Sequence, residues 1–406
     1  MSSKISAAIL TLILCGSAVI ALTSLHAAEP EAGQTVVCPK DDGYRGIWYS
    51  NQRQDDEYVY KYSGGLGTYC AKHRPFAVYA PEAKKTFFCY GGSPKDKNTL
   101  LHMVSYYDHQ TGKVPRPRFL LDKRTSDAHD NPVISLDDQG HVWIFSSSHG
   151  TSRPSYVWVS SEPYSIDAFE CVLVTNFSYT QPYFFPGRGF LFLHTKYGGG
   201  RRLFQMSSPD GRDWTEPEML AHIEMGHYQI SWPHENKVGT AFNFHPKPKG
   251  LNWRTNLYYM ETDDFGRTWK TVEGQSLELP LTTPDNPALV HDYRSEGLNV
   301  YMKDLAFDAQ GRPVILYLTS GGWESGPVND PRTWCTARWT GSEWELGGSI
   351  RSDNNYDSGS LYVERDDLWR IIGPTQPGPQ KYNTGGEGAL VQVRLPQKEK
   401  PTDIKK

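Results

Sequence analysis

Two histidines, His129 and His149, have the residue type and spacing of a proton-transfer pair. His129 precedes an apolar, β-branched run that ends at Leu136, and His149 follows a second run, 141–146. Between the runs lies Asp137-Asp138-Gln139-Gly140, which is typical of a tight hairpin turn. The two histidine positions of such an antiparallel hairpin lie at the same end, opposite the turn. The sequence therefore predicts two imidazoles close together at one rim of a sheet; the alternative is two solvated loop histidines.

Other polar side chains follow further predicted strands. Tyr179 lies in the segment 176–183, and Lys196 and Arg201 follow a strand predicted over 190–193. A second group is predicted to bind substrate: His73, Arg74, Tyr228, His245 and Tyr258. Each could instead serve the fold alone, the tyrosines by capping strand ends and the cations as solvated loop charges.

Imidazoles, phenols and cations at strand ends fit β-elimination from a uronate-containing polysaccharide. This reaction removes the C5 proton, which is acidic enough only when a cation neutralises the adjacent carboxylate. One His or Tyr takes that proton, and a second donates a proton to the leaving glycosidic oxygen. We therefore predict that His129 and His149 transfer the proton and orient substrate, that Tyr179 assists as acid or base, and that Lys196 or Arg201 neutralises the uronate.

Other reaction classes fit the residues less well. No Gly-x-Ser-x-Gly motif opens a helix, as a serine hydrolase would need. A glycosidase needs two well-placed carboxylates, and apart from Asp130 they are sparse around the candidate positions. Two alternatives to the lyase stay open: a non-catalytic carbohydrate-binding propeller, and a sialidase-like glycoside hydrolase.

The elements that would position these residues are strands. Short aromatic or β-branched segments, such as 76–80, 103–107, 238–244 and 314–318, alternate with turns carrying Asp, Asn and Gly. No helix is convincing. This spacing favours an all-β sandwich or propeller over βαβ units.

Two turns are more specific. The segments 207–214 and 261–269 resemble the Asp-box of sialidase-like propellers, in which Asp and Gly form a hairpin turn and the following Trp packs between sheets. The segments 306–313 and 137–140 are looser versions. The sequence therefore predicts an all-β, seven-bladed β-propeller of four-stranded antiparallel blades over residues 42–395.

Most of the chain, roughly 42–395, resembles the BNR-4 group of bacterial neuraminidase repeat propellers, which includes ulvan lyases and related rhamnose–glucuronate lyases. The resemblance is carried by His129-Asp130-Asn131-Pro132, by His149-Gly150, by the Tyr179 segment, and by 242–246 and 256–259. It implies that paired histidines, a tyrosine and an arginine act in elimination. This chain departs from the pattern where that arginine is expected: Lys196 stands there, and Arg201 and Arg202 lie beyond. Lysine lacks the bidentate fork that grips a carboxylate.

The sequence predicts a targeting segment at the N-terminus and a polar tail at the C-terminus. Residues 1–28 have a positive start at Lys4, an apolar run over 7–22 and small residues at the end, which is typical of a signal peptide. A retained membrane anchor is the alternative. We expect residues 29–41 to be a leader, 396–406 to be a disordered tail, and the protein to be secreted or periplasmic.

The amino-acid composition limits the classes of partner that we expect the protein to bind. The net charge is −4, with no basic cluster beyond Arg201–Arg202 and the terminal lysines, so we expect no nucleic-acid partner. The 24 tyrosines and 12 tryptophans suit stacking on sugar faces. We expect an acidic polysaccharide as partner, a monomer, and no membrane contact beyond export.

No cofactor is required by this chemistry. A structural zinc or calcium ion stays open, although no close ligand spacing such as His-x3-His is present. Five of the six cysteines follow residue 28, so at least one is unpaired or a metal ligand. Cys70 with Cys89 is the disulfide to test first, since export would permit one.

Overall fold

A computed structural model describes residues 29–41, 72–94, 99–364, 368–373, 392–393 and 404–405. The chain divides into two compact units, Met1–Pro30 and Glu31–Lys406, and all the described strands belong to the second. The expected signal peptide and most of the expected tail lie outside the described residues. No helix in the described part of the chain has the length and apolarity to cross a membrane.

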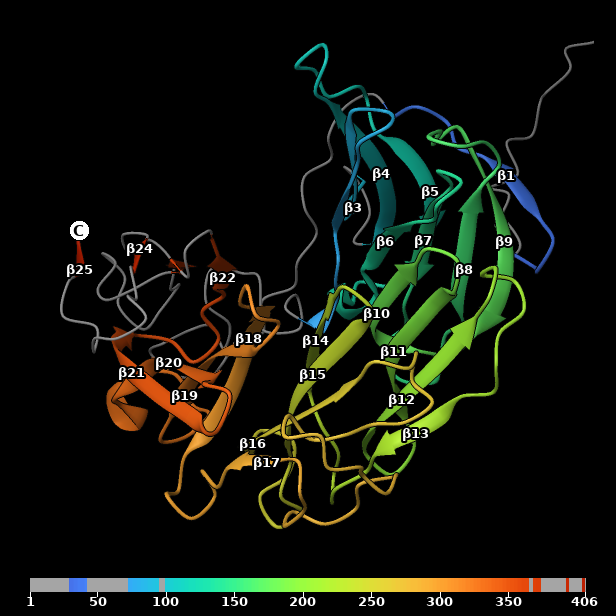
Figure 1. Cartoon of the computed structure of the whole chain (residues 1–406). Coiled ribbons are helices and arrows are strands. Elements are labelled where there is room, and N and C mark those ends of the chain that lie inside the picture. The colour runs from blue at the N-terminus through green and yellow to red at the C-terminus, as the bar shows by residue number, and fades with distance from the viewer. Residues whose placement is uncertain are drawn as a thin grey trace, which may run out of the picture. The chain divides into compact units, whose positions relative to one another are not determined.

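The described unit is all-β apart from short 3₁₀ turns, which include η3 (Ala128–Asp130) and η4 (Pro327–Asn329). Five antiparallel sheets follow one another along the chain (Figure 1). The first comprises β2 (Ala77–Ala80), β3 (Lys85–Gly92), β4 (Leu101–Asp108) and β5 (Arg118–Asp122). The second comprises β6 (Pro132–Leu136), β7 (Val142–Ser146), β8 (Ser155–Ser160) and β9 (Ala168–Thr175), and β1 (Thr35–Val37) adds a fifth strand beside β9. The stretch 29–41 thus contributes a strand to this sheet.

The later sheets repeat the pattern. The third comprises β10 (Ser178–Phe185), β11 (Gly189–Tyr197), β12 (Arg201–Ser208) and β13 (Glu218–Ala221). The fourth comprises β14 (Gln229–His234), β15 (Lys237–Phe244), β16 (Thr255–Thr262) and β17 (Leu289–His291), and the fifth β18 (Asn299–Phe307), β19 (Pro313–Ser320), β20 (Arg332–Trp339) and β21 (Trp344–Ser352). Two strand pairs follow: β22 (Ser360–Val363) with β23 (Trp369–Ile372), and β24 (Gln392–Val393) with β25 (Ile404–Lys405).

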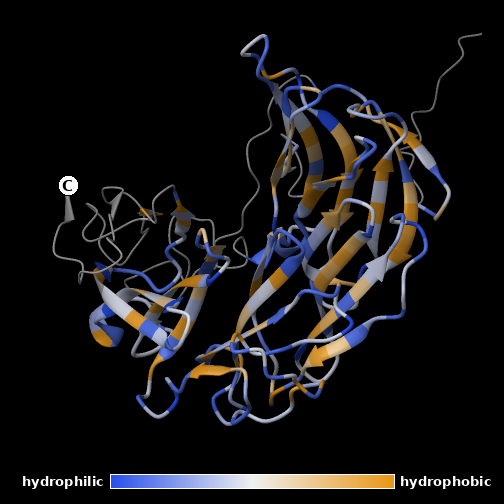
Figure 2. Cartoon of the chain, in the orientation of Figure 1, coloured by the Kyte–Doolittle hydropathy of each residue, from blue (hydrophilic) through white to orange (hydrophobic). Residues whose placement is uncertain are grey.

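The first strands of successive sheets are neighbours. β2 lies beside β6, β6 beside β10, β10 beside β14, β14 beside β18, and β18 beside β22. The inner strands of these sheets are buried on both faces, since every residue of β7, β8, β16 and β19 is buried. Figure 2 shows hydrophobic segments banded along the strands. Successive meanders with adjacent first strands are the units from which propellers are built, and the prediction of four-stranded antiparallel sheets is confirmed.

The two Asp-box turns position tryptophans between sheets. Asp210 accepts hydrogen bonds from the backbone N–H groups of the two residues that precede Trp214, and the Trp214 ring lies 6.1 Å from that of Phe145 in the neighbouring sheet. Trp269 is 1% exposed and donates to Gln205 Oε1 of the preceding sheet at 3.0 Å. The predicted turns and their tryptophans are confirmed.

No disulfide joins the four cysteines that lie in the described ranges. Cys38, Cys89 and Cys171 are buried free thiols, and Cys335 is half-buried. Cys70, the predicted partner of Cys89, lies outside the described residues.

Candidate active site

The hairpin of β6 and β7 brings His129 and His149 together. Pro132 pairs with Ser146 at the open end of the hairpin, so η3 before β6 and the loop after β7 start side by side. The two imidazoles are stacked, with ring centroids 4.1 Å apart and ring planes 14° from parallel. The predicted proximity of the pair is confirmed.

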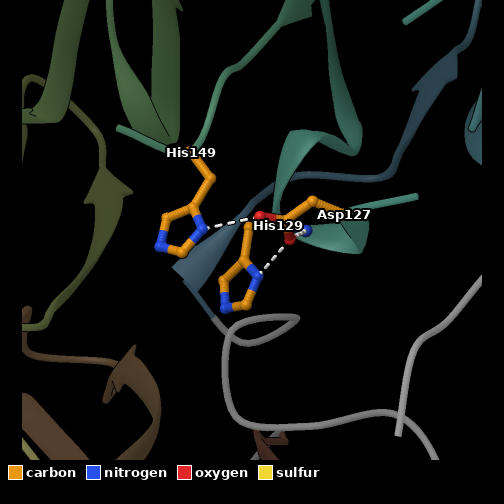
Figure 3. Close-up of side chains that lie close together, drawn as sticks. All are labelled: Asp127, His129 and His149. Atoms are coloured by element: carbon orange, nitrogen blue, oxygen red, sulfur yellow. Dashed lines mark hydrogen bonds and ion pairs between the residues drawn. The ribbon is translucent and has the colours of Figure 1, made fainter. Parts of the chain in front are cut away.

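Asp127, which the sequence reasoning missed, holds both imidazoles. Nδ1 of His129 donates to Oδ1 of Asp127 at 2.5 Å, and Nδ1 of His149 donates to Oδ2 at 2.7 Å (Figure 3). An ionised carboxylate can only accept, so both Nδ1 atoms carry a proton. Nε2 of each ring therefore carries the lone pair when the ring is neutral, and Figure 3 shows both Nε2 atoms turned away from Asp127.

The ionisation states of the trio follow from burial and these hydrogen bonds. Burial opposes ionisation of Asp127, but hydrogen bonds from His129 and His149 and their charges outweigh it and hold the pKa of Asp127 well below its usual range. Burial lowers the pKa of His129, and the opposing hydrogen bond to Asp127 only partly offsets this. His129 is therefore a neutral imidazole near pH 7.

Asp130, the one carboxylate noted near the pair in the sequence, anchors the loop that carries His149. It is fully buried and accepts from the backbone N–H of His149 at 2.7 Å and from Nε of Arg153 at 2.9 Å. Nζ of Lys123 lies 3.8 Å away. Since its oxygens are engaged by these cations, Asp130 supports the site and is not a second catalytic carboxylate.

Tyr179 reaches the pair through a bulge at the start of β10. The register against β11 shifts between Ser178 and Gln181, and Tyr179 has φ 51°, which is uncommon for a residue with a side chain. Its ring centroid lies 6.2 Å from that of His129 and 6.4 Å from that of His149. Tyr179 is only 1% exposed, and this burial raises its pKa well above the usual range, so the phenol is protonated.

Tyr197 and Arg201 form a second pair, of which the sequence reasoning predicted Arg201 but not Tyr197. They are cross-strand partners at the end of the β11–β12 hairpin, joined by three glycines, and so share one face. Nε of Arg201 donates to the Tyr197 hydroxyl oxygen at 3.2 Å, and that hydroxyl lies 3.3 Å from the hydroxyl of Tyr179. The Tyr197 ring lies 5.5 Å from that of His149. Burial raises the pKa of Tyr197, although Arg201 opposes this, so Tyr197 is a proton donor.

Lys196 is not brought to the histidines. Successive residues of a strand point to opposite faces, so Lys196 points away from the face that Tyr197 shares with Arg201. Its Nζ instead lies 5.9 Å from the centroid of Phe204. Of the two predicted cations, Arg201 is the one that lies beside the aromatic residues of the site.

Three of the predicted substrate-binding residues join the site. His73 lies 5.4 Å from Tyr179 between ring centroids, and burial lowers its pKa to about 3. The Tyr228 ring lies 5.3 Å from Tyr179 and 4.8 Å from the guanidinium of Arg201. His245 lies 5.2 Å from Tyr228, and burial lowers its pKa well below the usual range.

The other two have structural partners instead. Arg74 pairs with Asp304 at 2.8 Å and lies over the Trp232 ring. Tyr258 is fully buried, stacks on Phe242, and donates its hydroxyl proton to a backbone carbonyl at 2.8 Å. The structure therefore does not support a substrate contact for Tyr258, because its polar atom is already used within the fold.

The trio of Asp127, His129 and His149 could also hold a metal ion, since one ligand atom from each lies within 4.8 Å of the others. Two imidazole nitrogens and one carboxylate oxygen suit zinc better than calcium, which prefers oxygen ligands. A metal at Nδ1 would have to replace the two protons that now bind Asp127.

Comparisons with known proteins give one family. The model of the BNR repeat-containing family BNR_4 matches residues 87–347. A curated ulvan lyase of family PL25 from Pseudoalteromonas sp. (strain PLSV) is 24% identical over 65% of this chain and 62% of its own length. An ulvan lyase from Alteromonas sp. (strain LOR) is 25% identical over 71% of this chain and 66% of its own length. The matched region thus spans less than two thirds of each relative.

Solved structures agree on the fold. A PL25 ulvan lyase structure has a TM-score of 0.62 at 18% identity and covers 89% of this chain and 87% of its own. Another structure of that family, bound to -[GlcA(1-4)Rha3S]-, has a TM-score of 0.62 at 17% identity with the same coverage. The polysaccharide lyase Uly1 has a TM-score of 0.57 at 11% identity and covers 91% of each chain.

Proposed function

The chain belongs to the BNR_4 family of BNR repeat-containing proteins, and on that premise we propose that it is a polysaccharide lyase that cleaves a uronate-containing acidic polysaccharide by β-elimination. The curated relatives named above are ulvan lyases, which supports this reaction class. The observation that carries the proposal is the stacked pair of His129 and His149 on Asp127, set beside a hydrogen-bonded Tyr–Arg pair. Ulvan is the first substrate to test.

Neutralisation of the carboxylate comes first. Arg201 offers a guanidinium beside the pair, and its planar fork matches a carboxylate in two hydrogen bonds. With the uronate charge neutralised, the negative charge that develops when the C5 proton leaves is stabilised. This step makes abstraction by an ordinary side-chain base feasible.

His149 is the base and Tyr197 is the acid in this proposal. Nε2 of His149 takes the C5 proton, the C–H electrons form the C4–C5 double bond, and the bond from C4 to the glycosidic oxygen breaks. Tyr197 gives its phenolic proton to that oxygen. Because the two rings lie 5.5 Å apart, one water can return the proton from His149 to Tyr197 after the product leaves.

Accessibility and protonation support this assignment. The His149 side chain is 29% exposed and that of His129 is 14% exposed. The raised pKa of Tyr197 keeps its proton on the phenol at neutral pH, as an acid requires. Tyr179 is too buried to meet a sugar, so its role is to hold the Tyr197 hydroxyl.

We also propose that the sheets form a seven-bladed propeller and that the protein is exported and monomeric, as the sequence predicts. Four four-stranded sheets, one five-stranded sheet and the β22–β23 pair support a propeller of this size. No metal is needed for the steps above. If zinc binds, Asp127, His129 and His149 would hold it, and it would act as a Lewis acid.

A spectroscopic assay tests the reaction. The protein is incubated with ulvan and with other uronate polysaccharides, and ultraviolet absorbance is followed, because the unsaturated product absorbs and the substrate does not. We expect absorbance to rise. New reducing ends without absorbance would mean hydrolysis, and binding without either signal would mean a carbohydrate-binding module.

Matched variants test the site. We expect Arg201→Met to lower kcat/KM by about 10²- to 10³-fold, as loss of an electrostatic stabiliser does. Lys196→Met removes a neighbouring cation from the opposite face of the strand and should leave kcat/KM nearly unchanged. The reverse order would place the neutraliser at Lys196.

A further inference from the structure

A polar cavity opens at the end of the second and third sheets that lies opposite the histidine pair. It has a volume of about 560 Å³, and residues of three turns line it: 137–141 between β6 and β7, 187–189 between β10 and β11, and the Asp-box turn 209–212. The β6–β7 turn is at the other end of the hairpin from His129 and His149. The cavity is therefore separate from the candidate active site.

Hydrogen bonds fix the walls of the cavity. Asp137 accepts from the backbone N–H of His141 at 2.8 Å and from Nε1 of Trp143 at 2.9 Å. On another wall, the guanidinium of Arg212 donates to both carboxylate oxygens of Glu170, at 2.9 and 2.7 Å, and so ties the Asp-box turn to β9. Because these groups are held by the protein itself, a ligand meets a cavity that is already formed, which lowers the entropic cost of binding.

Three polar groups of the lining stay available to a ligand. The Asp138 carboxylate accepts one long hydrogen bond, from the backbone N–H of Gly187 at 3.4 Å, and pairs with no cation in the described part of the chain. The Arg188 guanidinium lies 4.9 Å from the centroid of Phe265 and has no carboxylate partner among the described residues. Nδ1 of His141 donates to a backbone carbonyl oxygen at 2.8 Å, so Nε2 of the neutral ring carries a lone pair. The cavity thus offers one cationic donor and two acceptors.

The charge of the lining excludes ions as the best ligands. A lining with more carboxylates than guanidiniums repels an anion such as a uronate. The carboxylates also do not form a metal site, because the one group within the described ranges that brings three ligand atoms within 4.8 Å of one another is Asp127, His129 and His149. The charged residues of the lining are Asp137, Asp138, Glu170, Asp210, Arg188 and Arg212.

An uncharged, polyhydroxylated ligand fits these groups better. Sugar hydroxyls donate to a carboxylate and to an imidazole lone pair, and they accept from a guanidinium. Phe184, which is half-buried and lines the cavity, offers an apolar surface for the C–H face of a sugar ring. The volume lies within the range of about 300–1,000 Å³ that is usual for small-molecule sites.

We propose that this cavity is a second carbohydrate site, which binds a neutral sugar unit through Asp138, Arg188 and His141. Its acidic lining distinguishes it from the region of Arg201, to which we assign the uronate. The inference does not depend on the lyase function, because such a site holds the protein on a carbohydrate whether or not the histidine pair is catalytic.

Isothermal titration calorimetry of the full chain with D-galactose, D-xylose and L-rhamnose tests the site. We expect at least one of these sugars to bind with a Kd of about 1 to 10 mM. Asp138→Ala and Arg188→Met should each weaken this binding about 10-fold or more, as loss of a hydrogen bond to a charged group does. Asp213→Ala removes an exposed carboxylate that does not line the cavity, and it should leave the affinity unchanged.

Two further variants separate this cavity from the active site. Ser161→Trp adds a large ring to an exposed position of the lining and keeps all three polar groups, so it should abolish sugar binding while Tm stays near the wild-type value. Arg201→Met should bind the sugar as the wild type does. Arg188→Met should keep the wild-type activity on ulvan, if ulvan is cleaved.

Two results would overturn the proposal. One is the absence of binding by all three sugars at about 100 mM, or binding that survives Asp138→Ala, Arg188→Met and Ser161→Trp. The other comes from titrations with glucuronate, glycine and calcium chloride. If one of these binds with the same dependence on the variants and no neutral sugar does, the cavity is a site for a charged ligand.

Discussion

Replacement of Asp127 by Asn tests the mechanism most directly. Asp127→Asn keeps the size of the side chain and its ability to accept from the backbone N–H of His129, a contact of 3.0 Å that caps η3. It removes the negative charge, however, and one of its two polar atoms becomes a donor. That atom can no longer accept from Nδ1, so one imidazole must lose its bond or change its tautomer.

The size of the effect follows from the two contacts. Nδ1 of His149 lies 2.7 Å from one carboxylate oxygen, and this bond strengthens when His149 becomes an imidazolium in the transition state. A hydrogen bond to a charged group contributes about 1.5–3 kcal/mol. Because each 1.36 kcal/mol is a factor of ten in rate, we expect kcat to fall about 10- to 150-fold. KM should change little, since both carboxylate oxygens of Asp127 are bonded to the two imidazoles.

The pH profile distinguishes this positioning role from a general loss of structure. Asp127 raises the pKa of His129 through its hydrogen bond and its charge, although burial lowers the net value. Removal of the carboxylate makes the imidazole of His129 harder to protonate, so the part of the acidic limb of kcat/KM that reports protonation of His129 should move to lower pH. The assay is the ultraviolet assay of product formation across pH, with Tm as the folding control and Asp213→Asn, an exposed surface carboxylate, as the matched variant. If Asp127→Asn keeps full kcat and the same acidic limb, the reasoning about the shared carboxylate is refuted.

Three further predictions follow from the same contacts. Tyr197→Phe keeps the ring against His149 but removes the proposed proton donor, so kcat should fall about 10²- to 10⁴-fold. The control Tyr258→Phe lies outside the site and should keep the wild-type kcat. Equal kcat values in the two variants would exclude Tyr197 as the acid. Burial lowers the pKa of His73, His194 and His227 to about 3, whereas an imidazole in the unfolded chain titrates near 6.5. The unfolded chain therefore binds more protons, and the urea midpoint of unfolding should fall as pH drops below about 6.5. His194→Phe should reduce this pH dependence, and a urea midpoint that stays constant between about pH 7.5 and 4.5 would contradict the prediction. Dialysis against EDTA should leave lyase activity intact because the proposed steps use only the side chains of Arg201, His149 and Tyr197. Activity that is lost on dialysis and restored by zinc would show that Asp127, His129 and His149 hold a catalytic ion.

The parts of the structure that the sequence predicted are those set by local pattern. The hairpin over 129–149 has strands, turn and flanking histidines within about twenty residues, so alternation and turn chemistry suffice to place both imidazoles at one end. The Asp-box turns are equally local, since Asp210 caps backbone groups only a few residues away. Asp127 was within reach of the same reasoning. An Asp two residues before His129 at the start of a turn is a capping position, and the same carboxylate can then meet the imidazole.

The remainder of the site depends on partners that are distant in sequence. Arg201 and Tyr228 come from different sheets, and Arg254 reaches the same ring from before β16. Nothing in the local sequence of these segments indicates that two guanidiniums share one tyrosine. Sequence reasoning therefore found several residues of the site without finding how they contact one another.

The placement of Lys196 and Arg201 depends on strand geometry, which their residue types do not reveal. Both cations lie near the end of one hairpin, and a resemblance based on spacing along the chain points to Lys196. The strand pairing reverses this, because Tyr197 faces Arg201 across β11 and β12 while Lys196 points to the other face. Gly200 and Gly226 make the arrangement feasible: a Cβ on Gly200 would lie 2.7 Å from the Met225 carbonyl oxygen, and one on Gly226 would lie 2.0 Å from that of Arg201. The loop that carries Tyr228 can therefore pack against Arg201, and the guanidinium lies between the Tyr197 hydroxyl and the Tyr228 ring.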